Sequence, residues 1–242
     1  MSPEDKARQR IDEFLDNAGW TIVPRDEFTP DHPTAVMEAL MLGNTKSDYL
    51  LFVDGKAIAV LEAKREENAL KKKVETQAEQ YAHTPQNWYG LWCNGLIPLV
   101  YMSNGTKILF KNLLTNQTEY TEIDAMHSPK EMLRLIGQTS TFGALPKLKK
   151  GTLRDCQFSA ENTFERYLRE GKKKNLAVLA TGSGKTYLAC LASYRLLNYT
   201  YVKKVLFLVD RNNLARQTES EFSQFNLTEK QVELGSLYLM RK

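Results

Sequence analysis

Asp48, Glu62 and Lys64 bring two carboxylates and one amine into a short stretch of the sequence. Two neighbouring carboxylates repel each other as anions, and a divalent cation between them relieves that repulsion. Oxygen ligands favour Mg²⁺, which keeps several waters and can ionise one of them as a nucleophile. The Ala63 carbonyl can supply a further oxygen, and Lys64 can stabilise charge developing on a phosphate. These residues predict a Mg²⁺ site made by Asp48, Glu62 and Ala63, with hydrolytic chemistry beside it.

Two predicted strands, 49–53 and 57–61, would position these groups. Asp54-Gly55 between the strands is a strong signal for a two-residue hairpin turn. The first carboxylate starts one strand, and the Glu-Ala-Lys triplet ends the other. Side chains two positions apart leave a strand on the same face, so the glutamate and the lysine are expected to project together. The hairpin then returns Asp48 to their side.

A polar helix is predicted over 66–83, ending before Pro85. Gln77 and Tyr81 lie four positions apart in this helix and therefore share one of its faces. We expect their side chains to contact the metal site or the backbone of a bound nucleic acid.

The order of these features resembles the PD-(D/E)xK nuclease family, in particular its members with an extra Gln-x-x-x-Tyr motif. Ser47-Asp48 stands where the family has Pro-Asp, which leaves the metal ligand in place. The resemblance implies a nuclease domain built on a mixed sheet. It also implies the catalytic residues Asp48, Glu62, Lys64, Gln77 and Tyr81.

That family also tends to place an acidic residue on its first helix. The corresponding helix is predicted over 3–18, where apolar positions share one face. Glu4, Asp12 and Glu13 all compete for the acidic role, which stays unassigned.

A glycine-rich loop lies between an apolar run, 176–180, and a predicted helix, 185–198. The loop and the start of the helix comprise Thr181, Gly182, Ser183, Gly184, Lys185 and Thr186. Glycines let backbone N–H groups approach phosphate oxygens, and the start of the helix adds its positive dipole. Lys185 would reach the β- and γ-phosphates of ATP, and the Thr186 hydroxyl would join the Mg²⁺ shell. The loop therefore predicts an ATP site.

This loop has Leu179 where the general pattern has its first glycine. The remaining Ala-Thr-Gly-x-Gly-Lys-Thr form resembles superfamily 2 helicases. Upstream, 153–157 resembles their Q motif, in which Gln157 would pair with adenine through an amide donor and acceptor. Downstream, 209–214 resembles their motif Ia, which contacts the nucleic-acid backbone. The resemblance implies the beginning of a RecA-like motor domain.

The predicted motor is incomplete. After Lys185, no Asp-Glu pair follows an apolar run, and no arginine finger or second motor domain is recognisable. Only two parallel strands, 176–180 and 205–209, are predicted, whereas a typical sheet has five or six. We therefore expect an N-terminal fragment of a longer protein that does not hydrolyse ATP by itself.

The other segments indicate an α/β protein of two domains. The segment 139–152 is rich in Gly, Pro, Thr and Lys and lacks periodicity, so it is the best boundary. We predict a mixed-sheet domain over 1–145 and a domain of helices alternating with parallel strands over 146–242. The further predicted elements are strands over 88–93, 97–102 and 106–110 and helices over 129–138 and 158–170.

Composition sets wide limits on function. The chain has 242 residues and a net charge of +4, which permits contact with a polyanion without requiring it. The three cysteines are far apart and lack metal-ligand spacing, as in a reducing compartment. No apolar run is long enough to span a bilayer, and no signal peptide is recognisable. We predict a cytoplasmic protein.

A nuclease followed by a helicase start resembles the restriction subunit of type I restriction–modification enzymes. The resemblance implies cleavage of double-stranded DNA after ATP-driven translocation, in a complex with methyltransferase and specificity subunits. Two alternatives are a helicase whose N-terminal domain binds nucleic acid without cutting it, and a non-enzymatic scaffold with a phosphate loop. The intact Asp48, Glu62 and Lys64 argue against the first alternative.

Overall fold

The computed structural model describes residues 3–65, 70, 77–208 and 220–222. The chain divides into two compact units, unit 1 over Met1–Lys147 and unit 2 over Leu148–Lys242. Each unit has its own apolar core.

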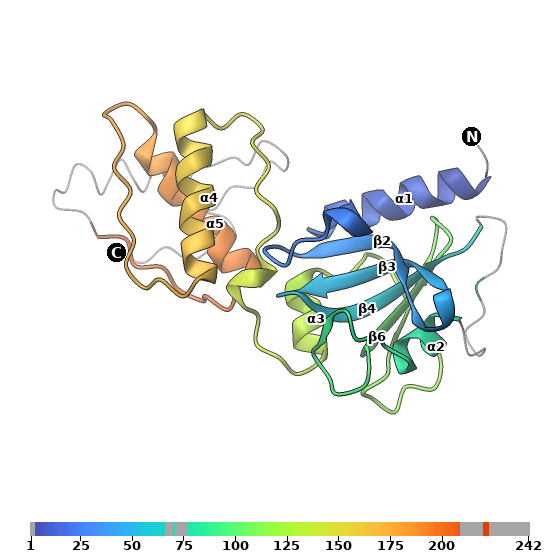
Figure 1. Ribbon diagram of the computed structural model, residues 1–242. Helices are drawn as coiled ribbons and strands as arrows, with labels where there is room; N and C mark the ends of the chain where they lie inside the picture. Colours follow the sequence, from blue (N-terminus) through green and yellow to red (C-terminus); the bar gives the residue numbers. More distant parts are fainter. Residues whose placement is uncertain (1–2, 66–69, 71–76, 209–219, 223–242) are drawn as a thin grey trace. The chain divides into compact units, whose positions relative to one another are not determined.

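Unit 1 is built around an eight-stranded mixed sheet, and its described residues also form three helices (Figure 1). The helices are α1 (Pro3–Asn17), α2 (Gln77–His83) and α3 (Pro129–Leu135). The strands are β1 (Thr21–Pro24), β2 (Thr34–Leu40), β3 (Lys46–Val53), β4 (Lys56–Ala63), β5 (Gly90–Leu91), β6 (Leu99–Ser103), β7 (Ile108–Asn112) and β8 (Thr121–Ile123). Short 3₁₀ turns lie at Arg25–Glu27, Leu42–Asn44 and Phe142–Ala144.

The strands follow the order β1-β2-β3-β4-β6-β7-β8, with β5 beside the start of β4. The pairs β1–β2 and β4–β6 are parallel, whereas β2–β3, β3–β4, β6–β7 and β7–β8 are antiparallel. The parallel pair β4–β6 requires a crossover, and α2 lies in it. This connection carries the chain from the Glu-Ala-Lys triplet to the predicted Gln-x-x-x-Tyr helix.

Both faces of the sheet are covered by apolar side chains. On one face, Ile11 and Leu15 of α1 and Met132 and Leu133 of α3 pack on alternate strand residues. On the other face, α2 contributes Ala78, Tyr81 and Ala82. This double burial explains why β3 and β4 are continuous apolar runs.

The predicted hairpin is confirmed. β3 and β4 pair antiparallel, and the two residues between them, Asp54 and Gly55, have φ of 50° and 68°. Positive φ at both central positions is the signature of the hairpin turn that Asp-Gly favours. Thr141 donates a hydrogen bond of 2.6 Å to the Asp54 carboxylate and holds the outside of the turn.

β1 and β2 lie between the first helix and the hairpin, and the sequence analysis predicted neither strand. Prolines at 24, 30 and 33 interrupt the strand pattern of this segment. β1 is an edge strand and Pro24 is its last residue, a position where the missing N–H costs no ladder hydrogen bond. The predicted strand over 88–93 is reduced to the two residues of β5. Most of the predicted helix over 66–83 lies outside the described residues, which contain it from Gln77 onward.

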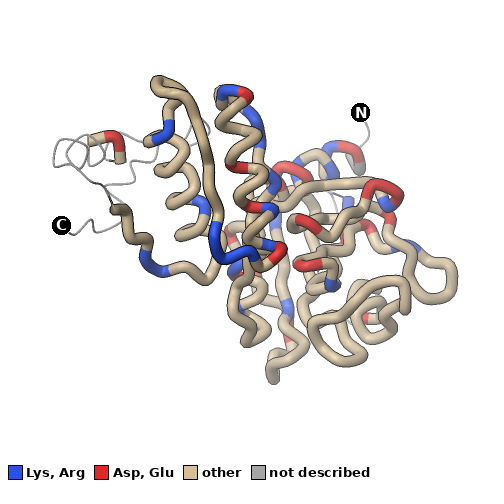
Figure 2. Tube along the Cα trace, turned by 60° about the vertical axis from the view of Figure 1, so that its left-hand side comes forward, with Lys and Arg blue, Asp and Glu red and all other residues tan. Residues whose placement is uncertain are grey.

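Unit 2 contains two described helices, α4 (Asp155–Arg169) and α5 (Lys185–Tyr199). Its core includes Leu148, Cys190, Leu191 and Tyr194. The acidic residues of α4, Asp155, Glu161 and Glu165, precede its basic residues Arg166 and Arg169, and the run Lys172–Lys174 follows the end of the helix (Figure 2).

The predicted parallel strands of unit 2 are not formed among its described residues. Leu176 and Val178 of the run 176–180 are 89% and 85% exposed, and Leu206 of the run 205–208 is 82% exposed. The apolar pattern identified these segments correctly as hydrophobic, but a strand also needs a neighbour to complete its ladder. Periodicity alone does not supply that neighbour.

A buried ionic group connects α4 to α5. The Arg195 guanidinium donates two hydrogen bonds to the Glu165 carboxylate, one of them 3.1 Å long between Nη2 and Oε2. Glu161, one turn earlier on α4, is 2% exposed, and its Oε1 has no hydrogen-bond partner among the described residues. Burial, together with the nearby Glu165 charge, raises the pKa of Glu161 to about 8.

The raised pKa of Glu161 predicts a pH-dependent stability. The neutral carboxyl stabilises the fold below its unfolded-state pKa of 4.5, and this contribution is lost as pH rises through about 8. Glu161→Gln should therefore leave the melting temperature nearly unchanged at pH 5. At pH 9 the substitution should raise the melting temperature, because it increases the free energy of unfolding by on the order of a few kcal/mol. Thermal unfolding followed by circular dichroism at both pH values measures this. Glu170→Gln, at the exposed end of the same helix, is the control and should not raise the melting temperature at pH 9. Equal melting temperatures for Glu161→Gln and wild type at pH 9 would contradict the prediction.

No helix among the described residues is long and apolar enough to cross a membrane.

Candidate nuclease and phosphate-loop sites

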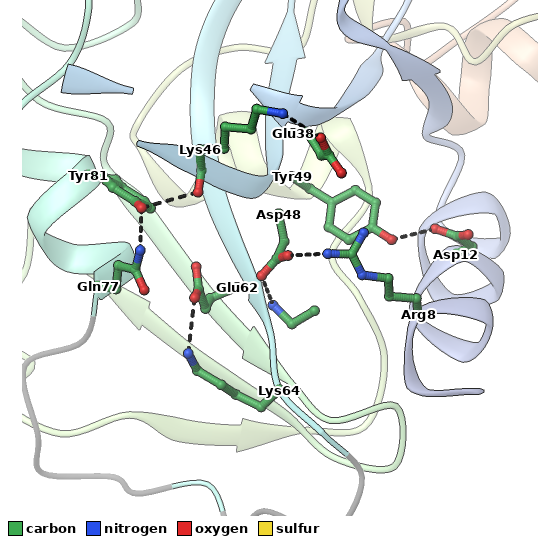
Figure 3. Close-up of polar contacts among 11 residues, drawn as sticks. Arg8, Asp12, Glu38, Lys46, Asp48, Tyr49, Glu62, Lys64, Gln77 and Tyr81 are labelled. Atoms are coloured by element: carbon green, nitrogen blue, oxygen red, sulfur yellow. Dashed lines mark hydrogen bonds and ion pairs between the residues drawn. The ribbon is translucent and has the colours of Figure 1, made fainter. Parts of the chain in front are cut away.

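The predicted acidic residues come together where β3 begins and β4 ends (Figure 3). The register pairs Tyr49 with Leu61, so Asp48 and Glu62 occupy the next position of the hairpin. The backbone pairing of the two strands ends at Tyr49 and Leu61. Beyond it, the Asp48 carboxylate, and not a backbone carbonyl of β3, accepts a hydrogen bond from β4. Its Oδ2 accepts a hydrogen bond of 2.9 Å from the Ala63 N–H. This contact brings Asp48 next to the Glu-Ala-Lys triplet, as its spacing predicted.

Lys64 lies on the same side as Glu62. Its Nζ is 3.0 Å from Glu62 Oε1, and the two side chains are 35% and 8% exposed. Burial raises the pKa of Glu62, the Lys64 ion pair opposes that rise, and the Asp48 charge adds to it. A cation between the two carboxylates would relieve both the burial cost and their repulsion.

The donor set fits Mg²⁺. Asp48 and Glu62 supply two carboxylates and Ala63 a backbone carbonyl, which matches a cation that binds one or two carboxylates and keeps its waters. Within the described part of the chain, no cluster of three or more His, Cys, Asp or Glu side chains could hold a metal. A site that encloses the cation fully with side-chain ligands is therefore absent from that part.

Gln77 and Tyr81 lie toward the start of β3, and the hydrogen bonds drawn in Figure 3 join them to each other and to Lys46. Gln77 Nε2 donates to the Tyr81 hydroxyl, which donates a hydrogen bond of 3.1 Å to the Lys46 carbonyl. Lys46 is two residues before Asp48 on the same strand. The pair is therefore placed to hold the strand that carries Asp48.

This geometry predicts a moderate effect for the helix pair. Tyr81→Phe removes the hydroxyl that reaches Lys46 and should lower cleavage by roughly 10- to 100-fold, the range typical of outer partners of metal ligands. Gln77→Ala should act in the same direction and more weakly. Cleavage rates at saturating Mg²⁺ measure both effects, with Gln80→Ala as an exposed control on the same helix. A wild-type rate in Tyr81→Phe would count against this role.

Arg8 and Glu38 are two site neighbours that the sequence analysis missed. Arg8 of α1 forms an ion pair with Asp48, with 2.8 Å between Nη2 and Oδ1. Glu38 lies opposite Asp48 in the register of β2 with β3, and its carboxylate is 2.7 Å from Lys46 Nζ. Glu38 has φ of 48°, a rare value for a residue with a side chain and a useful sign of a special site. Neither residue stands in a recognisable motif, because each reaches the site through strand or helix packing.

The acidic candidates of the first helix are now distinguished by position. Asp12 accepts a hydrogen bond of 2.7 Å from the Tyr49 hydroxyl, next to Asp48. Burial, together with Asp12, raises the pKa of Tyr49. Glu13 is exposed, and the side chain of Glu4 lies outside the described residues. Among the three, Asp12 is the one whose described contact is adjacent to the carboxylates.

The phosphate loop of unit 2 leads directly into α5, which begins at Lys185. Gly182 and Gly184 have φ of 78° and 83°, which explains why glycine is needed at both positions. Gly184 has a second constraint, because a Cβ there would come 2.4 Å from Gln157 Nε2. The loop thus ends at a helix N-terminus, the setting in which backbone N–H groups bind phosphate.

Side chains hold the loop carbonyls. Lys185 Nζ donates to the Ala180 and Leu179 carbonyls at 3.0 and 3.2 Å. Gln157 is buried; its Nε2 donates to the Ser183 carbonyl at 3.0 Å, and its Oε1 accepts the Arg154 N–H at 3.0 Å. Arg154 Nη1 in turn donates to the Gly182 carbonyl at 2.7 Å. Lys185 must release these carbonyls to reach a phosphate, and Gln157 must do likewise to pair with adenine.

Two family models match successive parts of the chain. Residues 29–136 match the model described as the second domain of the type I restriction enzyme EcoKI endonuclease subunit. Residues 150–239 match the model described as the type III restriction enzyme, res subunit. The first match contains the carboxylates and the Gln-x-x-x-Tyr helix, and the second contains the phosphate loop.

The chain is similar to type I restriction enzyme endonuclease subunits. It is 26% identical to the EcoKI subunit of Escherichia coli K12 over 90% of this chain and 23% of that protein. It is 27% identical to the EcoAI subunit of Escherichia coli, over 86% of this chain and 27% of that protein. A Staphylococcus aureus COL subunit is 23% identical over 88% of this chain and 24% of its own length.

This similarity confirms the resemblance to the restriction subunit of type I restriction–modification enzymes. The chain spans about a quarter of the length of these curated relatives. No solved structure matches the chain.

Proposed function

We propose that unit 1 is a Mg²⁺-dependent DNA-cleaving domain of the PD-(D/E)xK type. The observation that carries this proposal is the convergence of Asp48, Glu62 and Lys64 at the separating ends of β3 and β4. A mixed sheet with the carboxylates at one end, covered by helices on both faces, supports the same fold.

In this proposal, Asp48, Glu62 and the Ala63 carbonyl hold the cation. Bound Mg²⁺ supplies an activated water and compensates charge on the phosphate. Lys64, which is partly exposed beside Glu62, faces the phosphate and stabilises its developing negative charge. Gln77 and Tyr81 keep the start of β3 in register, so that Asp48 meets the same cation as Glu62.

We further propose that unit 2 begins an ATP-dependent motor of the RecA-like, superfamily 2 type, within a domain that starts near residue 146. Thr181, Gly182, Ser183 and Gly184 would surround the phosphates through their backbone N–H groups. Lys185 would bind the β- and γ-phosphates and Thr186 the Mg²⁺ that accompanies ATP, with Gln157 at the adenine. The match of residues 150–239 to a restriction-enzyme family model supports this assignment.

The whole protein is proposed to be the endonuclease subunit of a type I restriction–modification enzyme. Its substrate would be double-stranded DNA, cut after ATP-driven translocation. The curated relatives are named as subunits, which supports assembly with others. We propose the methyltransferase and specificity subunits as those partners, with sequence recognition supplied by the latter.

Nicking of a supercoiled plasmid tests the nuclease assignment. The 242-residue chain should nick the plasmid in the presence of Mg²⁺ and should be inactive in EDTA. A matched variant, Glu27→Ala, removes an exposed carboxylate of the same unit and should retain the activity. Plasmid binding without Mg²⁺-dependent nicking would favour the alternative of a non-catalytic nucleic-acid-binding domain.

A further inference from the structure

Arg8 approaches the carboxylates from α1, outside the sheet (Figure 3). Its Nη2 lies 2.8 Å from Asp48 Oδ1, and the Ala63 N–H occupies Asp48 Oδ2 at 2.9 Å. Both oxygens of the Asp48 carboxylate are therefore engaged by donors in this structure. A cation that binds Asp48 through Oδ1 must share or replace the guanidinium.

The backbone that carries Arg8 is firmly packed. Ile11 and Leu15 of the same helix are buried in the core, and Asp12 accepts the Tyr49 hydroxyl. Gly105, in the turn after β6, packs directly on the helix, because a Cβ there would come 2.9 Å from Ala7 Cα. The helix next to Arg8 is thus held by several contacts, whereas the Arg8 side chain is 37% exposed and its head has room to move.

The charges around Asp48 are arranged in pairs. Glu38, Asp48 and Glu62 lie across three adjacent strands, and each forms an ion pair with a cation among the described residues. Lys46 of β3 pairs with Glu38 of β2. Lys64, directly after β4, pairs with Glu62 of that strand. Among these three cations, Arg8 is the one that comes from outside the sheet. It contacts Asp48, whose strand lies between the strands of Glu38 and Glu62.

We propose that Arg8 is the resident counter-ion of Asp48 and that a divalent cation displaces it. Two cations on the same carboxylate oxygen repel each other strongly in a partly buried site, so the ion pair and the metal compete. A displaced guanidinium has the forked donors that suit a DNA phosphate. Arg8 is then a positioning residue that lowers metal affinity until a phosphate accepts its charge. This inference rests on the proposed nuclease site.

Metal titration without DNA tests the competition. Mn²⁺ binding to the full 242-residue chain is measured by calorimetry at physiological salt. Removing the competing ion pair, in Arg8→Ala, should tighten Mn²⁺ binding about fivefold, as expected for a partly exposed pair. Arg8→Gln, which keeps most of the side-chain stem, should give the same tightening, and Arg8→Lys should stay closer to wild type.

Two controls separate this effect from general electrostatics. Arg10→Ala removes the same charge from the same helix, where Arg10 contacts Thr106, and should change the affinity by less than about twofold because salt screens the more distant charge. Asp48→Asn by itself should weaken Mn²⁺ binding, and adding Arg8→Ala to it should not tighten that weakened binding, because the ion pair is already lost.

The outcomes distinguish this inference from the proposed function. If Mn²⁺ binds with Asp48 dependence but Arg8→Ala and Arg8→Gln leave its affinity unchanged or weaker, the inference fails and the nuclease site stands. An equal gain in Arg10→Ala also overturns it. If the chain binds no Mn²⁺ through Asp48 and Glu62, the proposed metal site fails and the inference fails with it.

Discussion

Asp48→Asn and Glu62→Gln should each reduce Mg²⁺-dependent DNA cleavage by more than about 100-fold. Loss of a residue that only supports a metal ligand costs up to about 100-fold. Asp48 and Glu62 are the proposed ligands themselves, so their loss should cost more. Both substitutions keep the size of the side chain and remove the charge that would hold the cation. In Asp48→Asn, the amide oxygen of the new side chain can still accept the Ala63 N–H, so the start of the hairpin should persist.

The measurement is cleavage by the complete assembly together with its ATP hydrolysis. Because the carboxylates lie in unit 1 and the phosphate loop in unit 2, ATP hydrolysis should continue at the wild-type rate. Glu27→Ala again serves as the exposed control. Loss of both activities in a variant with wild-type thermal unfolding would show that cleavage and motor functions are not divided between the units as proposed.

The 242-residue chain by itself is expected to show no measurable ATP hydrolysis. Lys185 and Thr186 can hold phosphate and Mg²⁺, but phosphoryl transfer also needs an acidic group to hold the metal and a residue to position water. No Asp-Glu pair follows an apolar run after Thr186. In the described structure, Lys185 donates to the Ala180 and Leu179 carbonyls, so its charge is directed at the loop.

Phosphate release with and without DNA measures this expectation. In the proposed full-length subunit, Lys185→Ala should lower ATP hydrolysis by roughly 100-fold or more, the usual cost of losing a group that stabilises transition-state charge. Lys173→Ala, in the exposed run after α4, is the matched control and should retain the activity. Steady turnover by the 242-residue chain that Lys185→Ala eliminates would contradict the expectation.

The nuclease-like site was largely predictable because its signals are local. Asp54-Gly55 identifies the hairpin turn, and the apolar runs on either side determine which residues meet across it. Asp48 is then brought next to the Glu-Ala-Lys triplet, as the structure shows. The glycine-rich loop before α5 was recognisable for a similar reason, since its glycines and lysine lie within one short segment.

The arrangement around the site depended on contacts between distant segments. Arg8 meets Asp48 because α1 packs on the sheet and against Gly105, a contact between residues far apart in the chain. Tyr81 is predicted to lie near the metal or DNA, and its hydrogen bond to the Lys46 carbonyl depends on where α2 docks. β1 was missed because local proline signals do not reveal that a segment will be an edge strand.

The sequence by itself determined the chemistry that this protein can offer: a carboxylate pair with a lysine at the end of a hairpin, and a glycine loop at the start of a helix. These are properties of residue type and short-range spacing, which the backbone expresses wherever the segment folds. Only the tertiary structure decided which charges surround Asp48, how Gln157 and Arg154 engage the loop, and that the runs 176–180 and 205–208 form no ladder among the described residues. The physical reason is that ion pairs, helix docking and strand pairing each require a partner from elsewhere in the chain, and a pattern within one segment does not specify that partner.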